Sequence, residues 1–318
     1  MRVGAIDCGT NSIRLLIADI DDGGRLTDVV RTMKVVRLGQ GVDATGILAD
    51  EALARTFAAA EEYAGQLRGH GAESLRFVAT SATRDAGNRQ AFVDGIRDRL
   101  GVEPEVISGG EEAELSFTGA ASALSAHPDE RILVVDLGGG STEFVLGNGS
   151  GVLAARSTDM GCVRFTERHL VSDPPSAAEM EAAEKEINAY IDEVLRDVPL
   201  GEADRLVGVA GSITTVTAHA MGLAEYQPDA IHGTALDAAK TREACTSLLR
   251  MSRAERAALP YMHPGRVDVI GAGALIWRTI NDRVAELTSG RVDGATASEH
   301  DILDGIALSA ARPRSEAN

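Results

Sequence analysis

The apolar and polar positions in the first part of the chain follow two different periods, which predicts strands and helices in turn. Apolar Ile13 and Leu15 alternate with Arg14, which is the period of two that a half-buried strand requires. From Leu53 onward, apolar residues recur every three to four positions, which predicts an amphipathic helix, and we expect Asp50 to cap its N-terminus. By the same reasoning we predict strands at residues 3–6, 13–20, 27–36, 75–79 and 105–107, and helices at 50–69, 89–100 and 111–124.

The strand pattern starts again near the middle of the chain, after a polar segment at residues 125–131. Ser176 and Glu179 have the spacing of a capping box, which marks the start of another helix. This half is predicted to hold strands at 132–135, 144–146 and 206–209, and helices at 176–194, from 212, and at 237–249, 267–283 and 302–311. Strands followed by alternating helices and strands, twice over, predict duplicated α/β domains at residues 1–125 and 126–318, with a short polar tail after residue 310.

Two glycine-bearing turns stand at equivalent places in the two halves, each between two predicted strands. The first has Asp7 at its mouth, followed by Gly9, Thr10, Asn11 and Ser12. The second has Asp136 at its mouth, followed by Gly138, Gly139, Gly140, Ser141 and, beyond the turn, Glu143. Glycine lets backbone N–H groups approach an anion, hydroxyls add donors, and a flanking carboxylate suits Mg²⁺. The turns therefore predict that a phosphate chain and Mg²⁺ are held in a cleft between the two domains.

A third glycine turn follows the predicted strand at residues 206–209. Gly211 and Ser212 there open a predicted helix, whose N-terminal amides suit an anion. Such a turn by itself is commonly a plain strand-to-helix connection. As the third in this series, we assign it to phosphate binding.

Composition narrows the class of protein. The chain has 318 residues, of which 44% are hydrophobic and 3% aromatic, as expected for an α/β protein with two domains. The formal net charge of −17 argues against nucleic-acid binding, which needs a basic surface. Cys8, Cys162 and Cys245 have no paired spacing, which disfavours a disulfide framework or a zinc cluster. With no signal-like N-terminus and no membrane-length apolar run, we expect a cytoplasmic protein without a membrane partner.

Several longer segments resemble one family in the actin-like ATPase superfold. They are Asp7 to Ser12, Ala79 to Asp85, Ile107 to Ala113 followed by Gly119, Asp136 to Glu143, and Met160 to Arg164. In this order, they are similar to the exopolyphosphatase / guanosine pentaphosphate phosphatase (Ppx/GppA) family, from Asp7 to about Gly305. The resemblance implies duplicated actin-like ATPase (ribonuclease H-like) domains in a short, two-domain form, and a homodimer.

The same resemblance implies roles for individual residues. Glu112 matches the general base that activates water, and Arg84 matches a phosphate-binding arginine. Asp136 and Glu143 match positions linked to Mg²⁺, and the carboxylate of Asp7 is expected to join them. Positions linked to substrate or phosphate contact are matched by Asn11, Gly138, Ser141 and Cys162. Adjacent glutamates on a helix point about 100° apart, so Glu111 is not expected to share the task of Glu112.

The substrate is expected to be a phosphoanhydride. Because the chain is acidic and lacks the appended region of long family members, short polyphosphate is favoured over long polymer. Guanosine pentaphosphate or a nucleoside triphosphate is the alternative substrate. A small-metabolite kinase of the same superfold, or a non-catalytic nucleotide sensor, are the rival functions. Retention of Glu112 and Arg84 argues for hydrolysis.

Overall fold

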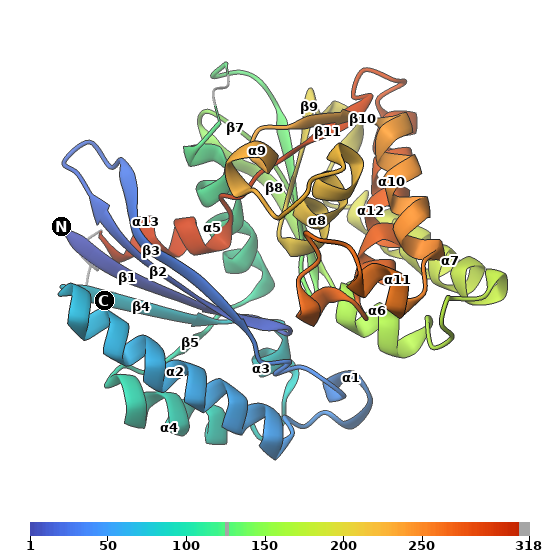
Figure 1. The fold of residues 1–318 in the computed structure, drawn as a ribbon. Coiled ribbons are helices and arrows are strands. Elements are labelled where there is room, and N and C mark those ends of the chain that lie inside the picture. The colour runs from blue at the N-terminus through green and yellow to red at the C-terminus, as the bar shows by residue number, and fades with distance from the viewer. Residues whose placement is uncertain (125–126, 312–318) are drawn as a thin grey trace. The chain divides into compact units, whose positions relative to one another are not determined.

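The structure is a computed structural model that describes residues 1–124 and 127–311, and it falls into two compact units (Figure 1). The first unit comprises residues 1–119 together with residues from 302 onward, and the second comprises residues 120–301. The chain therefore leaves the first unit once and returns to it near its C-terminus. The predicted boundary at 125 and 126, and the predicted tail at 312–318, lie outside the described residues.

The first unit is built on a five-stranded mixed sheet with the order β3-β2-β1-β4-β5. Its strands are β1 (Arg2–Cys8), β2 (Ser12–Ile20), β3 (Leu26–Val35), β4 (Ser74–Ala79) and β5 (Glu105–Val106). The first three strands pair antiparallel as a meander, and β4 and β5 continue the sheet parallel to β1. The carboxyl ends of β1, β4 and β5 consequently meet at one edge of the sheet.

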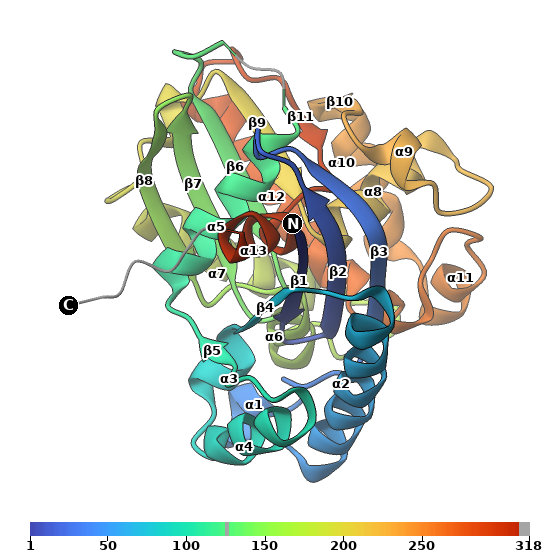
Figure 2. The same ribbon diagram turned by 90° about the vertical axis from the view of Figure 1, so that its left-hand side faces the viewer.

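Helices cover both faces of this sheet, because its strands are apolar on both sides. Ile6 and Ile13 point to the face packed by α2 and α4, whereas Ala5 and Leu16 point to the face packed by α5 and α13 (Figures 1 and 2). The helices are α1 (Val42–Thr45), α2 (Asp50–His70), α3 (Ser81–Asp85), α4 (Arg89–Leu100), α5 (Gly109–Ser122) and α13 (Ile302–Ala310). A β-carbon at Gly305 of α13 would lie 2.0 Å from the carbonyl oxygen of Leu115, so the two helices on the second face are in close contact.

The second unit repeats this plan. Its sheet has the order β10-β11-β9-β6-β7-β8. Read from the other edge, β8-β7-β6-β9-β11 corresponds strand by strand to β3-β2-β1-β4-β5 of the first sheet, and β10 is an additional edge strand. Again three antiparallel strands, β6 to β8, are followed by strands parallel to the first, β9 and β11. The strands are β6 (Ile132–Leu137), β7 (Thr142–Asn148), β8 (Gly151–Thr158), β9 (Arg205–Val209), β10 (Ala235–Asp237) and β11 (Gly294–Ala297).

The helices of the second unit enclose its larger core, which includes the fully buried Trp277. They are α6 (Cys162–Arg168), α7 (Ala177–Val194), α8 (Gly211–Met221), α9 (Pro228–Ile231), α10 (Ala238–Arg250), α11 (Arg253–Ala257) and α12 (Ile270–Leu287), with 3₁₀ turns at Leu200–Glu202 and Pro264–Arg266. Because both units share one strand order, the predicted fold class of duplicated actin-like ATPase (ribonuclease H-like) α/β domains is confirmed. Within the described ranges, no helix has both the length and the apolar character to cross a membrane.

Some predicted boundaries were wrong by one or two residues. Asp50 is the first helical residue of α2 and Ala49 precedes it as the cap, without a side-chain hydrogen bond. Helix α5 begins at Gly109 because the hydroxyl of Ser108 accepts a hydrogen bond from the N–H of Glu111 (3.2 Å). The capping box of Ser176 is confirmed. Helices α3 and α6 were not predicted, because each is too short to show a period.

Candidate active site

The first turn is held from behind by the chain that follows β3. A hydrogen bond from the N–H of Gly9 to the carbonyl of Ser12 (3.0 Å) closes the turn. The carbonyls of Thr10 and Asn11 accept hydrogen bonds of 2.8–3.0 Å from N–H groups within residues 36–39. Since a trans peptide points its N–H opposite to its carbonyl, the N–H groups of Asn11 and Ser12 are directed away from that segment. The turn thus presents amides on one side, as an anion site needs.

The residues after β4 reach the same edge of the sheet. The hydroxyl of Thr10 in the first turn is hydrogen-bonded to the hydroxyl of Ser81 at the start of α3 (2.9 Å), and both residues are buried. Helix α3 also carries Arg84, one turn further on. The turn and Arg84 are therefore parts of one edge, as the parallel arrangement of β1 and β4 requires.

Arg84 and Glu112, the two predicted catalytic residues, are in direct contact. Nη1 of Arg84 donates a hydrogen bond to Oε2 of Glu112 (3.1 Å) and another to the carbonyl of Ile107 (3.0 Å). Glu112 lies in the first turn of α5 and is 7% exposed. A carboxylate buried this far and held by a guanidinium has a fixed orientation, which a group that positions water must have.

The neighbouring glutamate points elsewhere, as predicted. Oε1 of Glu111 accepts a hydrogen bond of 2.6 Å from Nη2 of Arg76, and the same guanidinium binds Glu105 of β5. The side chain of Glu111 is 43% exposed. Glu111 therefore belongs to a surface ion-pair network, whereas Glu112 lies at the sheet edge with Arg84.

In the second unit, the glycine-rich turn rests on the N-terminus of α6. Its closing bond, from the N–H of Gly138 to the carbonyl of Ser141, has the same length as in the first turn, 3.0 Å. The Gly138 carbonyl accepts from the N–H of Cys162 (3.0 Å), and the Gly139 carbonyl accepts from the next two N–H groups of α6 (2.8 and 3.2 Å). The N–H groups of Gly139 and Gly140 consequently point away from α6. The Gly140 carbonyl accepts from the side chain of Arg164, which orients the N–H of Ser141 in the same way, so the turn presents three successive amides on one side.

Two residues behind this turn hold it in place. Arg164 donates from Nε to the carbonyl of Gly140 (3.0 Å), and so fixes the last peptide of the turn. Gly161 lies so close that a β-carbon there would be 2.3 Å from the carbonyl oxygen of Gly139. Both residues belong to the segment Met160 to Arg164, from which the sequence alone predicts no role for either.

Asp136 and Glu143 lie directly opposite each other on β6 and β7, and both are buried, at 6% and 1% exposure. Oε1 of Glu143 accepts a hydrogen bond from the hydroxyl of Ser157 (2.8 Å). Opposed residues of an antiparallel pair have β-carbons about 5 Å apart, and like charges there repel. A divalent cation offsets this repulsion, and carboxylate oxygens are ligands that Mg²⁺ prefers, so the donor set fits that ion.

No group of three or more His, Cys, Asp or Glu side chains suited to a metal occurs within residues 1–124 and 127–311. That finding is compatible with Mg²⁺, which is usually bound by one or two carboxylates together with water and substrate phosphate. Asp7, the third predicted ligand, lies in the other unit and accepts two hydrogen bonds from Arg14, from Nε (2.9 Å) and Nη2 (2.7 Å).

Gly211 and Ser212 begin α8, as predicted, and the residue before them has an unusual backbone. Ala210 has φ 73° and ψ 169°, a region that normally only glycine occupies. Because such strain persists only where the surroundings impose it, the conformation marks this turn as tightly constrained.

An arginine that the sequence analysis missed lies against the start of α8. Nη1 of Arg266 donates to the hydroxyl of Thr215 (3.0 Å), and a β-carbon at Gly211 would lie 2.4 Å from Nη2 of this arginine. No local pattern marks Arg266, because it follows a short Pro-Gly segment without periodicity; only the tertiary structure brings it to α8.

Cys162 connects the glycine-rich turn to α8. Its N–H binds the carbonyl of Gly138, and its thiol lies beside the hydroxyl of Ser212. Burial raises the pKa of the Cys162 thiol above its ordinary value. The thiol is therefore a poor nucleophile, and Cys162 acts in this unit as a buried packing residue.

Comparisons with known proteins agree in family and fold. The chain matches the Ppx/GppA phosphatase family over residues 16–310. A protein named Exopolyphosphatase 2 from Mycobacterium tuberculosis is 51% identical, with 98% of each chain covered. A crystal structure of an exopolyphosphatase-like protein superposes with a TM-score of 0.93 at 47% identity, covering 97% of each chain. The crystal structure of an Aquifex aeolicus member of the Ppx/GppA family superposes with a TM-score of 0.79 at 29% identity, again covering 97% of each chain.

Proposed function

The chain belongs to the Ppx/GppA phosphatase family, and from this premise we propose that it is an Mg²⁺-dependent exopolyphosphatase that prefers short chains. In the proposed reaction, the oxygen of a water molecule forms a bond to the terminal phosphorus while the bond from that phosphorus to the bridging oxygen breaks. The products are inorganic phosphate and a chain shortened by one unit. The observation that carries the proposal is the buried Glu112 carboxylate, held at 3.1 Å by Arg84.

Glu112 is assigned to the attacking water. Its carboxylate accepts a hydrogen bond from the water, orients its oxygen towards phosphorus and takes up the proton as the new bond forms. Because phosphoryl transfer depends mainly on positioning and charge stabilisation, a firmly oriented carboxylate is sufficient for this role.

Arg84 is assigned to the phosphate. Both of its hydrogen bonds to Glu112 and Ile107 use Nη1, so Nη2 and Nε are the atoms that we assign to phosphate oxygens. A planar guanidinium matches two phosphate oxygens at once and takes up the charge that they carry in the transition state.

The amides of the two turns and of the start of α8 are assigned to the remaining phosphate oxygens. In the first unit these belong to residues 10–12, and in the second to residues 139–141 and 211–212, because the N–H groups of Gly9 and Gly138 close their own turns. Asp136 and Glu143 would hold Mg²⁺ through their carboxylates. When bound, the ion neutralises charge on phosphate oxygens.

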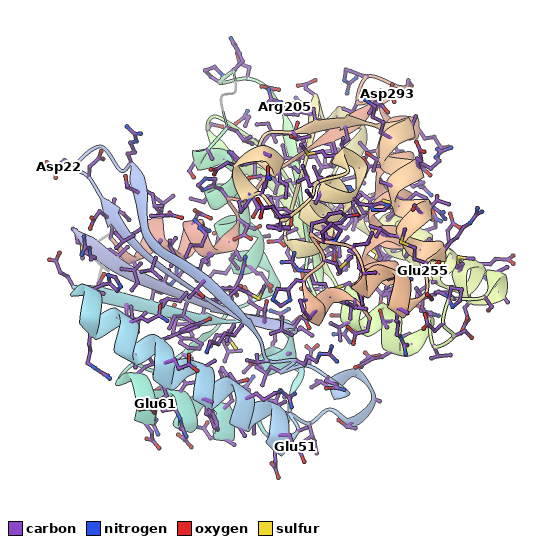
Figure 3. The ribbon with its side chains drawn as sticks, viewed as in Figure 1. Asp22, Glu51, Glu61, Arg205, Glu255 and Asp293 are labelled. Atoms are coloured by element: carbon purple, nitrogen blue, oxygen red, sulfur yellow. The ribbon has the colours of Figure 1, made fainter. Side chains whose placement is uncertain are left out.

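Charge supports a short substrate. The net charge is −17, and acidic side chains such as Glu51 and Glu61 stand on the solvent side of α2 (Figure 3). A long polyanion would have to pass along such a surface, at a cost of roughly 1 kcal/mol for each like charge met at contact distance. A short chain meets only the site itself.

A phosphate-release assay with defined substrates tests the reaction and the substrate together. The panel contains polyphosphates of defined length, guanosine pentaphosphate, ATP and GTP, each with Mg²⁺. We expect the highest kcat/KM on short polyphosphate. Faster turnover of chains of hundreds of units would contradict the length preference, and faster turnover of guanosine pentaphosphate or of a nucleoside triphosphate would favour the alternative substrate.

The catalytic assignment is tested by a matched pair of neighbouring glutamates. Glu112→Gln keeps the shape but removes the base, so kcat should fall by a factor of roughly 10²–10⁴. Glu111→Gln makes the same change one residue away, where the side chain contacts Arg76, and should keep kcat within about threefold of the wild type. Equal activity of the two variants would refute the role of Glu112.

A cytoplasmic homodimer completes the proposal. All three cysteines are free and buried, which suits a reducing compartment. The mass in solution, from light scattering after size-exclusion chromatography, tests the dimer: a monomeric mass throughout the concentration range of the assay would contradict it.

A further inference from the structure

The two turns carry opposite charges at one of their equivalent positions. In the first unit, β1 and β2 place Asp7 opposite Arg14; in the second, β6 and β7 place Asp136 opposite Glu143. Each acid stands two residues before the first glycine of its turn, and each partner stands two residues after the closing serine. The duplicated hairpins therefore carry a cation and an anion at one and the same place.

Arg14 fits this place closely. Both Nε and Nη2 donate to Oδ2 of Asp7, at 2.9 and 2.7 Å, and the two side chains are 21% and 8% exposed. An arginine remains charged at every physiological pH. The pair in the first unit thus has no net charge, whereas the ionised pair in the second unit would carry two negative charges.

We propose that Arg14 is a built-in substitute for a metal ion. In the first unit the guanidinium of Arg14 lies next to the acid, at the position that a divalent cation would occupy in the second unit. Asp7 is therefore the ion-pair partner of Arg14 and does not bind Mg²⁺. The second half of this statement rests on the proposed Mg²⁺ site at Asp136 and Glu143. It follows that the first hairpin adds no divalent ion to the one proposed for the second, and that the acid of the first turn is neutralised whether or not Mg²⁺ is present.

A plain cross-strand ion pair is the competing explanation. Such a pair would stabilise the hairpin by roughly 0.2–1 kcal/mol and would have no bearing on cations. The two explanations differ in what happens when Arg14 becomes an acid: a substitute for a metal leaves a metal site behind, whereas a plain ion pair leaves only repulsion.

Titration of the metal-free full-length chain with Mn²⁺ distinguishes the two explanations without reference to activity. The signal of the free ion in electron paramagnetic resonance gives the number of ions bound. Arg14→Glu should bind about one equivalent more than the wild type, because it recreates the acid pair of the second unit. The double variant Arg14→Glu, Asp7→Asn should lose that additional ion. If a folded Arg14→Glu variant bound the same number of Mn²⁺ ions per chain as the wild type, the proposal would be overturned.

A second variant covers the case in which Arg14→Glu fails to fold. Asp7→Asn keeps the size of the side chain, and on the proposal it leaves the number of bound Mn²⁺ ions unchanged in the wild-type background. Loss of a bound ion in Asp7→Asn would show that Asp7 is a metal ligand despite Arg14, and would overturn the proposal.

Failure of the proposed function has a different result. If Asp136→Asn binds as much Mn²⁺ as the wild type, the metal site assigned to the second unit is wrong. The comparison of the wild type with Arg14→Glu and Asp7→Asn still decides the role of Arg14, because those variants alter only the first unit.

Discussion

Replacing Gly161 by alanine should damage the second unit through a purely steric effect. Gly161 has φ −138° and ψ 158°, which alanine adopts without strain. The new β-carbon would lie 2.3 Å from the oxygen and 2.4 Å from the carbon of the Gly139 carbonyl, and 2.5 Å from the carbon of Gly140. These are backbone atoms, so the turn and the start of α6 must separate by about 1 Å to restore ordinary contact.

The magnitude follows from the bonds that this separation stretches. Three hydrogen bonds, of 2.8, 3.0 and 3.2 Å, join the N–H groups of residues 162–164 to the carbonyls of Gly138 and Gly139. At about 1 kcal/mol each, their loss should lower the free energy of unfolding by about 3 kcal/mol. Alanine also lowers the conformational entropy of the unfolded chain, which stabilises the folded state by about 0.4–1 kcal/mol. The net loss in the free energy of unfolding is therefore about 2–3 kcal/mol.

Urea unfolding followed by circular dichroism measures this loss, and phosphate release measures the effect on the site. Because the carbonyls that orient the turn amides are displaced, KM for polyphosphate should rise together with the loss of stability. Gly65→Ala is the matched control: Gly65 lies inside α2 with no atom within 4 Å of the added β-carbon, and alanine there should stabilise by about 0.5–1 kcal/mol. If Gly161→Ala were as stable and as active as the wild type, the close contact between the turn and α6 would be refuted.

Three further changes test other parts of the structure. Ala210→Gly relieves a backbone conformation that costs about 1–3 kcal/mol, so the free energy of unfolding should rise despite the greater flexibility of glycine, and a fall in urea unfolding would contradict the strain at φ 73°. Arg164→Met removes the donor to Gly140, and KM for short polyphosphate should rise about tenfold while kcat changes less; an unaltered KM would exclude a positioning role. Glu179 accepts hydrogen bonds from the backbone N–H and hydroxyl of Ser176 in the capping box of α7, which lowers its pKa to about 2. A depressed carboxyl pKa stabilises the folded state above the unfolded pKa of about 4.5, and this stabilisation disappears as the pH falls through about 2. In urea unfolding, Glu179→Gln should therefore be less stable than the wild type at pH 6, and the two proteins should become equally stable near pH 2. An equal difference in stability at both pH values would contradict this assignment.

Much of the site was predictable because it is local. The two turns lie between short apolar strands, and each has glycines within a few residues of a carboxylate. This local pattern predicts an anion site without any tertiary information. The divergence of Glu111 and Glu112 also followed from helix geometry alone. Even the contrast between Arg14 and Glu143 was available in principle, because turns of equal length set the same register in both hairpins, although the sequence analysis placed Asp7 with the metal ligands.

Other parts could not be read from the chain because they depend on contacts between distant segments. The contact of Arg84 with Glu112 requires β4 and β5 to pair in parallel, and the contact of Arg266 with α8 joins residues that no periodic pattern connects. The return of α13 to the first unit rests on its packing against β1, β2 and β4, with a close contact to α5 at Gly305. The two glycine turns and the acids at their mouths follow from the sequence alone, because short-range geometry dictates them; the side chains that lie behind each turn follow only from the fold, because burial and packing act between residues that are far apart along the chain.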